Sequence, residues 1–338
     1  MTGTLDTQEL VGALKAAAEP TRLRILLLLA AGELNVKDLT QILGQSQPRI
    51  SRHLKLLVEA SLVERFREGS WVYFHVSDRT EGGRLVRRLL ATVDPGDAIL
   101  KRDSDRAEQQ KREREAAAQD YFRAHAENWD RIRSFYVPEA AVEAAITAAL
   151  DGPPFKFFVD LGTGTGRMLE LFAPHYARGL GLDVNQSMLA YARSRLSRAG
   201  LSVAEVRHGD IYDLALPDRV ADGIVMHQVL HYLSEPALAI REAARILAPG
   251  GRLLIADFAP HGLEELRTHH AHERLGFDET QVSGWLEDAG LADVEVQSLA
   301  PDGSDARQEL TVSLWRALKT GTAEEPATTS KKLERIAP

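Results

Sequence analysis

The chain has 338 residues, enough for two or three domains, and its 44% hydrophobic content is ordinary for folds that bury a core. It contains no cysteine, which excludes disulfides, thiolate metal sites and a cysteine nucleophile. The formal net charge is -8, but residues 1–92 hold more Lys and Arg than Asp and Glu, so this front end is a candidate for contact with nucleic acid. The apolar run at residues 25–31 is far too short to span a bilayer and the N-terminus lacks a signal-peptide layout, so we expect a cytoplasmic protein without a membrane segment.

The first 93 residues predict a series of short helices. Amphipathic spacing covers residues 10–18, and a second helix begins near Pro20 and ends at Gly32. A short helix over residues 36–43 is closed by Gly44, and another spans residues 46–58, with Ser46 as its candidate N-cap. Two short helices joined by a glycine turn predict a helix–turn–helix.

The helix over residues 46–58 has an apolar face and a polar face. The residues expected to face the core are Ile50, Leu54, Leu57 and Val58. The residues expected to point outward and contact DNA are Gln47, Arg49, Ser51, Arg52 and Lys55. Such a second helix enters the major groove of double-stranded DNA in helix–turn–helix proteins. Alternating residues 62–66 and 71–76 flank a turn at 68–70 and predict a hairpin suited to be a wing.

Four stretches of this region, at residues 14–22, 32–34, 47–55 and 67–73, resemble the ArsR-type winged-helix repressors. The resemblance spans nearly all of residues 8–93 and implies a homodimer that binds an operator and pairs through its first and last helices, here residues 10–18 and 83–91. Metal-sensing members place cysteines where this chain has Asn35 to Asp38, so thiolate sensing of arsenic or soft metals is excluded. The resemblance favours DNA contact over a merely solvated face for Arg49, Arg52 and Lys55, and it leaves His53 without a role.

Residues 94–137 predict a connector. Asp94 to Asp97 break the preceding helix, and residues 101–119 are dense in charge with almost no apolar stripe, which predicts an exposed helix. From Tyr121 to Tyr136 aromatic residues recur at roughly helical spacing. A helix packed on the next domain is the plainer interpretation. The sharper one is that this segment caps a cofactor pocket, with Tyr121 as the contact.

A glycine-rich turn at residues 160–166 organises the rest of the chain. The apolar run 155–159 predicts a buried parallel strand, and it breaks into Gly162, Gly164 and Gly166 before a helical pattern resumes. Asp160 precedes the glycines, and Asp183 follows about twenty residues later at the end of the next strand. An acid at Asp183 suits ribose hydroxyls, and an acid at Asp160 suits a cationic ligand better than a pyrophosphate, so S-adenosylmethionine is favoured over NAD.

Strands and helices alternate through the following region. Helices are predicted at residues 139–150, 187–199 and 236–247, strands at 203–208, 223–226 and 252–257, and a closing antiparallel pair at 294–298 and 309–315. This order predicts an α/β fold with a Rossmann-like, doubly wound sheet, and ligands beyond the carboxyl ends of the strands.

Residues 138–318 resemble the class I S-adenosylmethionine-dependent methyltransferases. Carried over by the resemblance, Asp160, Gly162, Gly164 and Gly166 hold the methionine part of S-adenosylmethionine or S-adenosylhomocysteine. Asp183 takes the ribose, Asp210 and Ile211 the adenine, and His227 follows the fourth strand. The Asn-Pro-Pro aromatic signature of DNA and protein amide methylases is absent, which disfavours methylation of nucleic-acid bases.

No catalytic residue stands out. Methyl transfer from a sulfonium is an in-line displacement, so positioning supplies much of the acceleration and an acceptor-side base is dispensable. His227 and His231 have the spacing of neighbours on a helix face, and four histidines cluster beside Glu264 and Glu265, namely His261, His269, His270 and His272. No metal is expected, because no paired spacing is backed by a separate ligand. Residues 319–338 have the composition of a disordered tail.

Two hypotheses for the whole chain remain open. The first is a dimeric DNA-binding regulator whose methyltransferase-like domain senses S-adenosylhomocysteine or S-adenosylmethionine; some fused chains of this layout resemble repressors of methionine-cycle genes. The second is a working methyltransferase on a small molecule, with a DNA-binding domain for autoregulation or dimerisation. A sensor and an enzyme need the same cofactor contacts, so the cofactor positions do not decide between them.

Overall fold

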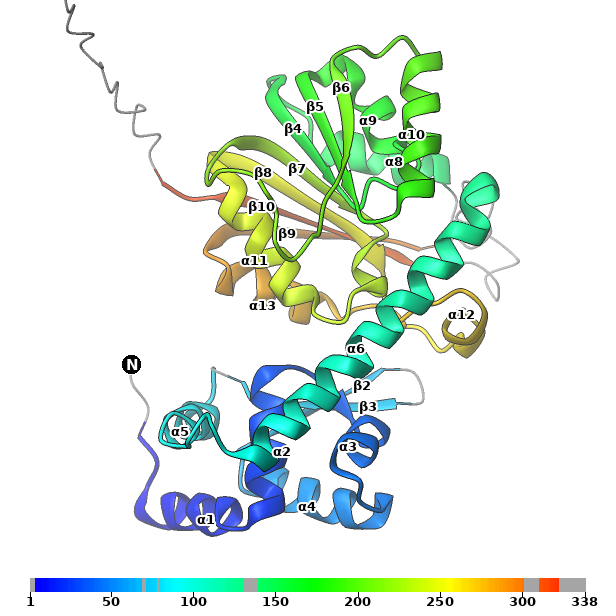
Figure 1. The fold of residues 1–338 in the computed structure, drawn as a ribbon. Helices are drawn as coiled ribbons and strands as arrows, with labels where there is room; N and C mark the ends of the chain where they lie inside the picture. The colour runs from blue at the N-terminus through cyan, green and yellow to red at the C-terminus, as the bar shows by residue number, and fades with distance from the viewer. Residues whose placement is uncertain (1–3, 69–70, 78, 130–138, 301–309, 322–338) are drawn as a thin grey trace, which may run out of the picture.

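The computed structural model describes residues 4–68, 71–77, 79–129, 139–300 and 310–321. A helical N-terminal domain and a larger α/β domain lie on opposite sides of one long helix, which runs diagonally along both (Figure 1). The wing tip at residues 69–70, the predicted aromatic position Tyr136, and most of the predicted tail lie outside the described residues. No helix in the described part of the chain has the length and apolarity needed to cross a bilayer.

The N-terminal domain has a winged-helix arrangement. Its elements are α1 (Thr7–Ala17), α2 (Pro20–Ala31), β1 (Leu34–Asn35), α3 (Val36–Leu43), α4 (Gln47–Glu59), β2 (Glu64–Glu68), β3 (Trp71–His75) and α5 (Glu81–Leu90). The three strands form an antiparallel sheet in the order β1-β3-β2. The predicted hairpin is therefore present, with a third short strand that the sequence analysis did not foresee.

Local chemistry explains where the two helices of the helix–turn–helix begin and end. Asn35 and Asp38 form a capping box at the start of α3, and Gly44 ends that helix with a left-handed φ of 64°. Ser46 occupies the N-cap of α4 as expected, but its side chain makes no capping bond there. On α4, Ile50, Leu54 and Leu57 are buried, while Val58 packs at the edge of the same core.

The long helix is α6 (Ala98–His125), with 28 residues, followed by the short η1 (Ala126–Asn128). Asp97 caps its start, because its carboxylate accepts bonds from the backbone N–H groups of Ile99 and Leu100. The predicted helical connector is present, but it is not exposed along its whole length. Asp103 and Ala118 are buried. Other polar side chains of α6 form ion pairs with residues of both domains.

The larger domain is built on a seven-stranded sheet of order β6-β5-β4-β7-β8-β10-β9. Its strands are β4 (Phe155–Leu161), β5 (Tyr176–Asp183), β6 (Ala204–His208), β7 (Ala221–His227), β8 (Leu247–Phe258), β9 (Leu291–Leu299) and β10 (Val312–Lys319). β10 pairs antiparallel with β8 and β9, whereas the β4, β5, β6, β7 and β8 pairings are parallel. This is the predicted Rossmann-like, doubly wound sheet.

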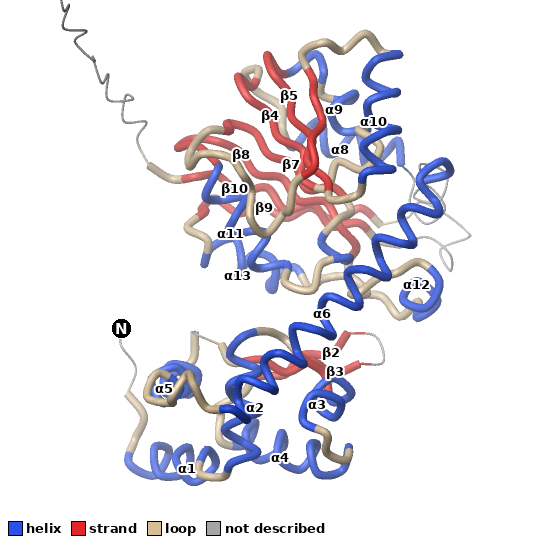
Figure 2. The backbone as a smooth tube through the Cα atoms, viewed as in Figure 1, coloured by secondary structure: helices blue, strands red, loops and turns tan. Residues whose placement is uncertain are grey.

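Helices cover both faces of this sheet (Figure 2). They are α8 (Glu139–Ala149), α9 (Arg167–Leu171), α10 (Gln186–Arg198), α11 (Pro236–Ile246), α12 (Glu264–His269) and α13 (Glu279–Asp288), with the short helical turns η2 (Ala173–His175) and η3 (Leu230–Tyr232). Residues of α8, α9 and α10 pack in one core and residues of α11 and α13 in the other. The chain runs outward from β4 to β6 and then returns to β7, so the crevice at the carboxyl ends of β4 and β7 is a topological switch point.

Candidate functional site

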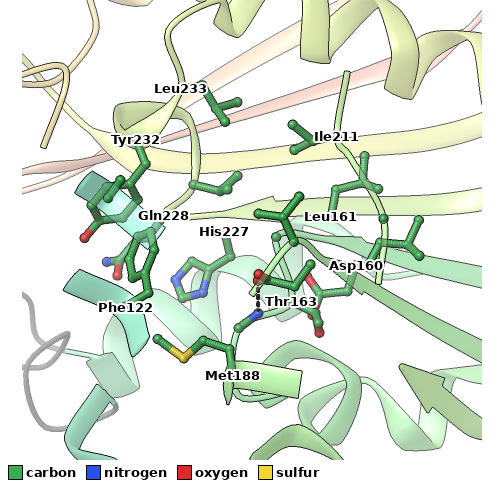
Figure 3. Close-up of a pocket in the computed structure, with 18 of the residues that line it drawn as sticks. Phe122, Asp160, Leu161, Thr163, Met188, Ile211, His227, Gln228, Tyr232 and Leu233 are labelled. Atoms are coloured by element: carbon green, nitrogen blue, oxygen red, sulfur yellow. Dashed lines mark hydrogen bonds between the residues drawn. The ribbon is translucent and has the colours of Figure 1, made fainter. Parts of the chain in front are cut away.

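A cavity opens at the carboxyl ends of the parallel strands. Its volume is about 320 Å³, within the range of small-molecule sites. The segments that follow β4, β5, β6 and β7 supply most of its wall, and α6 with Trp129 supplies the rest. Figure 3 shows Phe122 and Tyr232 on one side of this cavity and Asp160 and Thr163 on the other, with His227 between them.

The glycine turn after β4 depends on backbone conformations that side chains disfavour. Gly162, Gly164 and Gly166 have φ values of 72°, 51° and 81°. A Cβ at Gly162 would lie 2.4 Å from the Val229 side chain, so this glycine permits close packing. Gly166 packs against Ala192 and is not part of the cavity wall, whereas Gly162 and Gly164 are.

Two buried carboxylates fix the shape of the turn. The Thr163 hydroxyl donates to Asp160 at 2.6 Å, and Asp183 accepts from the Gly164 N–H at 2.9 Å and the Asn185 N–H at 2.8 Å. Burial raises the pKa of Asp183 despite these bonds. Both acids line the cavity, so the expected ribose acid and the acid ahead of the glycines lie together.

The remaining cofactor positions also line the cavity. Asp210 and Ile211 follow β6, and Asp210 accepts a bond from the Tyr212 N–H at 2.9 Å. His227 ends β7 and is buried in the wall. The hypothesis that His227 and His231 share a helix face is wrong, because a strand end and a short helical turn hold them.

Tyr121 is not part of the cavity wall. Its hydroxyl bonds to His270 Nδ1 at 2.7 Å instead. The wall residues from this segment are Glu115, Ala116, Ala118, Gln119, Phe122 and Trp129. Phe122 packs edge-on against Tyr232 with ring centroids 4.7 Å apart and against Trp129 at 5.2 Å. The spacing of residues 115, 118, 119 and 122 places them on one face of a helix, and this is the signal that sequence reasoning missed.

Glu115 lines the cavity with a side-chain oxygen that none of the described residues satisfies. Its Oε1 atom is buried and finds no hydrogen-bond donor in the described part of the chain. Burial raises the pKa of Glu115; Lys111 opposes this shift, and Asp210 and Glu235 add to it. A buried carboxylate oxygen without a donor is costly, which marks this end of the cavity as suited to a hydrogen-bond donor.

Histidines gather behind Tyr232. His231 Nδ1 bonds to the buried Asp257 at 2.7 Å, and the His231 ring lies 4.2 Å from that of His272. Burial lowers the pKa of His261 to about 4 and holds that of His272 well below its ordinary value. Among the described residues, no group of three or more His, Cys, Asp or Glu side chains has the geometry to hold a metal ion. The sequence did not indicate the His231–Asp257 pair, because the two residues are distant in the chain. They meet only because β8, which holds Asp257, lies next to β7, which precedes His231.

The polar face of α4 is exposed. Its residues expected to contact DNA all lie at the surface, namely Gln47, Arg49, Ser51, Arg52 and Lys55. Lys55 lies 3.7 Å from Glu59 of the same helix, a weak exposed pair. His53 is different, because it is half-buried 3.7 Å from Glu19, and burial lowers its pKa.

Comparisons with known proteins match two segments of the chain. Residues 19–65 match the family described as "Bacterial regulatory protein, arsR family", and residues 159–255 match the family described as "Methyltransferase domain". A probable S-adenosylmethionine-dependent methyltransferase of Mycolicibacterium smegmatis is 29% identical over 155 residues, covering 41% of this chain and 58% of that protein. An uncharacterized 37.1 kDa protein in transposon TN4556 of Streptomyces fradiae is 32% identical over 180 residues, covering 48% and 52%.

Solved structures also align with the larger domain. One is the N-methyltransferase NodS from Bradyrhizobium japonicum WM9 in complex with S-adenosyl-L-homocysteine, at 22% identity and a TM-score of 0.49, covering 60% of this chain and 98% of that one. The chain spans about half the length of the two curated relatives described above. The chain therefore joins an ArsR-family helix–turn–helix domain to a methyltransferase domain of Rossmann-like fold.

Proposed function

We propose that this protein is a DNA-binding transcriptional regulator that binds S-adenosylmethionine or S-adenosylhomocysteine in the cavity and changes its DNA affinity in response. The observation that carries the proposal is that α6 is both a wall of the cavity and a helix packed along the winged-helix domain. An enzyme does not require its DNA-binding domain to share an element with its cofactor pocket. A sensor requires such a connection, because a ligand shifts an equilibrium only by contacting something that differs between two states.

The chemistry of the cavity fits this ligand. Asp160, Asp183, Asp210 and Glu115 make the lining acidic, and Arg167, a cationic lining residue, is engaged by Glu143 and Glu170. An acidic lining suits a sulfonium and an amino group and opposes a pyrophosphate.

In this assignment the predicted cofactor residues that line the cavity keep their roles, and Tyr121 has none. The glycine turn with Asp160 takes the methionine part, Asp183 the ribose, and Asp210 with Ile211 the adenine. His227 borders the ligand from β7. Gly166 supports the turn from behind, by packing against Ala192.

The DNA-binding half of the proposal rests on α4 and α1. Arg49, Arg52 and Lys55 present exposed cationic groups that suit the major groove and its phosphates. Leu10, Val11 and Leu14 are 37%, 43% and 41% exposed on α1, as expected if this helix pairs in a cytoplasmic homodimer together with α5. Methionine-cycle genes are the expected targets, and selecting genomic fragments with the purified protein tests this.

Operator titration tests the central claim. Fluorescence anisotropy with a DNA fragment selected by the protein is measured without ligand, with S-adenosylmethionine and with S-adenosylhomocysteine. A ligand-dependent change in Kd supports the sensor. Equal Kd values in all three conditions refute it.

A second candidate function is methyl transfer to a small molecule. It is favoured by His231, whose Nδ1 is bonded to Asp257 and whose Nε2 is buried without a partner among the described residues. A carboxylate orients this imidazole as it would orient a general base, and because His231 lies behind Tyr232 and outside the cavity wall, an acceptor reaches it only if Tyr232 moves. Production of S-adenosylhomocysteine in the presence of candidate acceptors, and its loss in His231→Ala, tests this function.

A further inference from the structure

The helix α6 contacts α3, the first helix of the helix–turn–helix, at three places. Arg114 pairs with Asp38 near the start of α3. The Gln110 side chain donates to Gln41 at 2.8 Å, and the Arg106 side chain donates to the Ile42 carbonyl at 3.0 Å. Because α3 packs against α4, these contacts reach the helix that presents Arg49 and Arg52.

Arg114 is also bonded to the methyltransferase domain. Its Nη1 donates to Glu273 at 2.7 Å, while its Nη2 donates to Asp38, which is only 3% exposed. Asp38 is in addition the capping-box partner of Asn35, so its carboxylate holds the first turn of α3. One guanidinium therefore joins the cap of α3 to the domain that contains the cavity.

The next residue along α6 faces the cavity. Glu115 lines it at the end where Asp210 lies, and the Glu115 Oε1 atom is buried without a hydrogen-bond donor among the described residues. One turn further, Gln119 accepts two bonds from the Asn185 side chain, at 3.0 and 3.1 Å, in the segment that follows Asp183. Residues of α6 thus lie within electrostatic reach of Asp210 and are bonded to the segment that follows Asp183.

We infer that Glu115 is a ligand-contacting residue that accepts a hydrogen bond from the amino group of a nucleoside, and that the neighbouring Arg114 bridge passes occupancy of the cavity to α3. The inference deepens the proposed function and rests on it. An empty cavity leaves the Glu115 oxygen unsatisfied and disfavours this position of α6, whereas a donor from the ligand stabilises it. Stabilising α6 here holds Arg114 between Asp38 and Glu273, so ligand and operator binding become coupled, and the coupling is reciprocal.

The first experiment separates the bridge from the ligand site. Operator Kd is measured by anisotropy with and without saturating S-adenosylhomocysteine for the wild type, Arg114→Met and Arg112→Met. Arg112 lies on the exposed side of α6, near Glu108, and is the matched control. In Arg114→Met the ratio of the two Kd values falls to within about twofold of one, while the calorimetric affinity for S-adenosylhomocysteine stays within about twofold of wild type; Arg112→Met keeps the full ratio.

A second variant guards against misfolding. Glu273→Gln removes the charge on the methyltransferase side of the bridge and leaves Arg114 bonded to Asp38. It is expected to reduce the Kd ratio as Arg114→Met does, with an unchanged melting curve in the absence of ligand. If Arg114→Met does not fold, this variant decides the question.

The third comparison tests the ligand contact. Glu115→Gln is expected to lose about tenfold in affinity for S-adenosylhomocysteine, because a charge-assisted acceptor is replaced by a neutral one. Glu113→Gln, on the exposed face of the same helix, is expected to bind as the wild type does.

The failures of the two claims can be told apart. A wild-type Kd ratio of one overturns the proposed function and this inference with it. A wild-type response that persists undiminished in both Arg114→Met and Glu273→Gln overturns the inference alone. Unchanged ligand affinity in Glu115→Gln overturns the ligand contact.

Discussion

Two helices of this protein carry several charged side chains, which lie in different environments. The polar face of α4 carries Arg49, Arg52 and Lys55 into solvent, and Glu59 of the same helix lies beside Lys55. The charges of α6 include Asp103, which is fully buried, and Arg114, which joins two domains. Exposed cationic side chains on the winged-helix domain are available to bind a polyanion such as DNA. Charged side chains that pair with residues distant in the sequence instead hold the two domains together.

The first way to test this contrast is to remove the exposed cations of α4. Arg49→Ala with Arg52→Ala is expected to weaken operator binding by more than about 100-fold, because each loses a base or phosphate contact. Anisotropy measures the loss, and calorimetry with S-adenosylhomocysteine is expected to give the wild-type affinity. Arg193→Ala with Arg198→Ala removes the same charge from the exposed face of α10 and is the control. Retained operator binding would contradict the assignment of α4.

The second test removes a buried partner of α6. The Arg24 guanidinium contacts both oxygens of Asp103, at 2.5 and 3.0 Å. Arg24→Met removes the guanidinium that is bonded to the buried Asp103 carboxylate. This variant is expected to lose about 3 kcal/mol of unfolding free energy, measured by chemical denaturation. Arg112→Met is expected to stay within about 0.5 kcal/mol of wild type, as exposed pairs do. Equal losses of unfolding free energy in Arg24→Met and Arg112→Met would mean that the buried and exposed charges of α6 contribute equally to stability.

The third test uses pH. Because the pKa of Glu115 is raised in the folded protein, the unfolded chain ionises first as the pH rises above the ordinary value near 4.5, and the native state loses stability until its own carboxyl ionises. Glu115→Gln lacks this loss. In the ligand-free protein its melting temperature is therefore expected to exceed that of wild type by an amount that grows from about pH 5 and then levels off. Glu113→Gln, which lies in solvent, is expected to show no such trend.

The smallest effect belongs to the exposed pair on α4. Glu59→Ala removes the neighbour of Lys55 and is expected to change stability by less than about 0.5 kcal/mol. It is also expected to leave operator affinity intact or to raise it slightly, because one repulsive carboxylate is removed from the DNA-facing helix. A loss of DNA binding would indicate that Lys55 is held in place by this pair.

The sequence predicted the structural features that depend on residues close together in the chain. The end of α3 at Gly44 and the glycine turn after β4 follow from short-range chemistry, and both are present. The alternation of apolar runs was sufficient to predict the doubly wound sheet, because buried parallel strands read as continuous hydrophobic segments.

What escaped prediction was decided by contacts between distant segments. Asp103 looks like any charge on a solvated helix until Arg24 is placed beside it, 79 residues away. Tyr121 was the expected contact because aromatic residues recur at helical spacing in a segment thought to cap the pocket, but the rotation of α6 turns Phe122 inward and leaves Tyr121 beside His270. Asp257 and His231 meet only because β8 lies next to β7.

Two of the tryptophans give this protein intrinsic optical probes at separate places. Trp129 borders the cavity, where its indole Nε1 lies 3.7 Å from the position of a Cβ at Gly164. Trp71 starts β3 in the wing, and the Arg267 guanidinium of the other domain lies over its ring at 4.8 Å. A Trp129→Phe protein retains the Trp71 signal at the domain boundary, and Trp71→Phe retains the cavity signal. Trp285 and Trp315 emit in both proteins as a common background, so the difference between the two stopped-flow traces reports ligand entry at the cavity and movement at the domain boundary, without any attached dye.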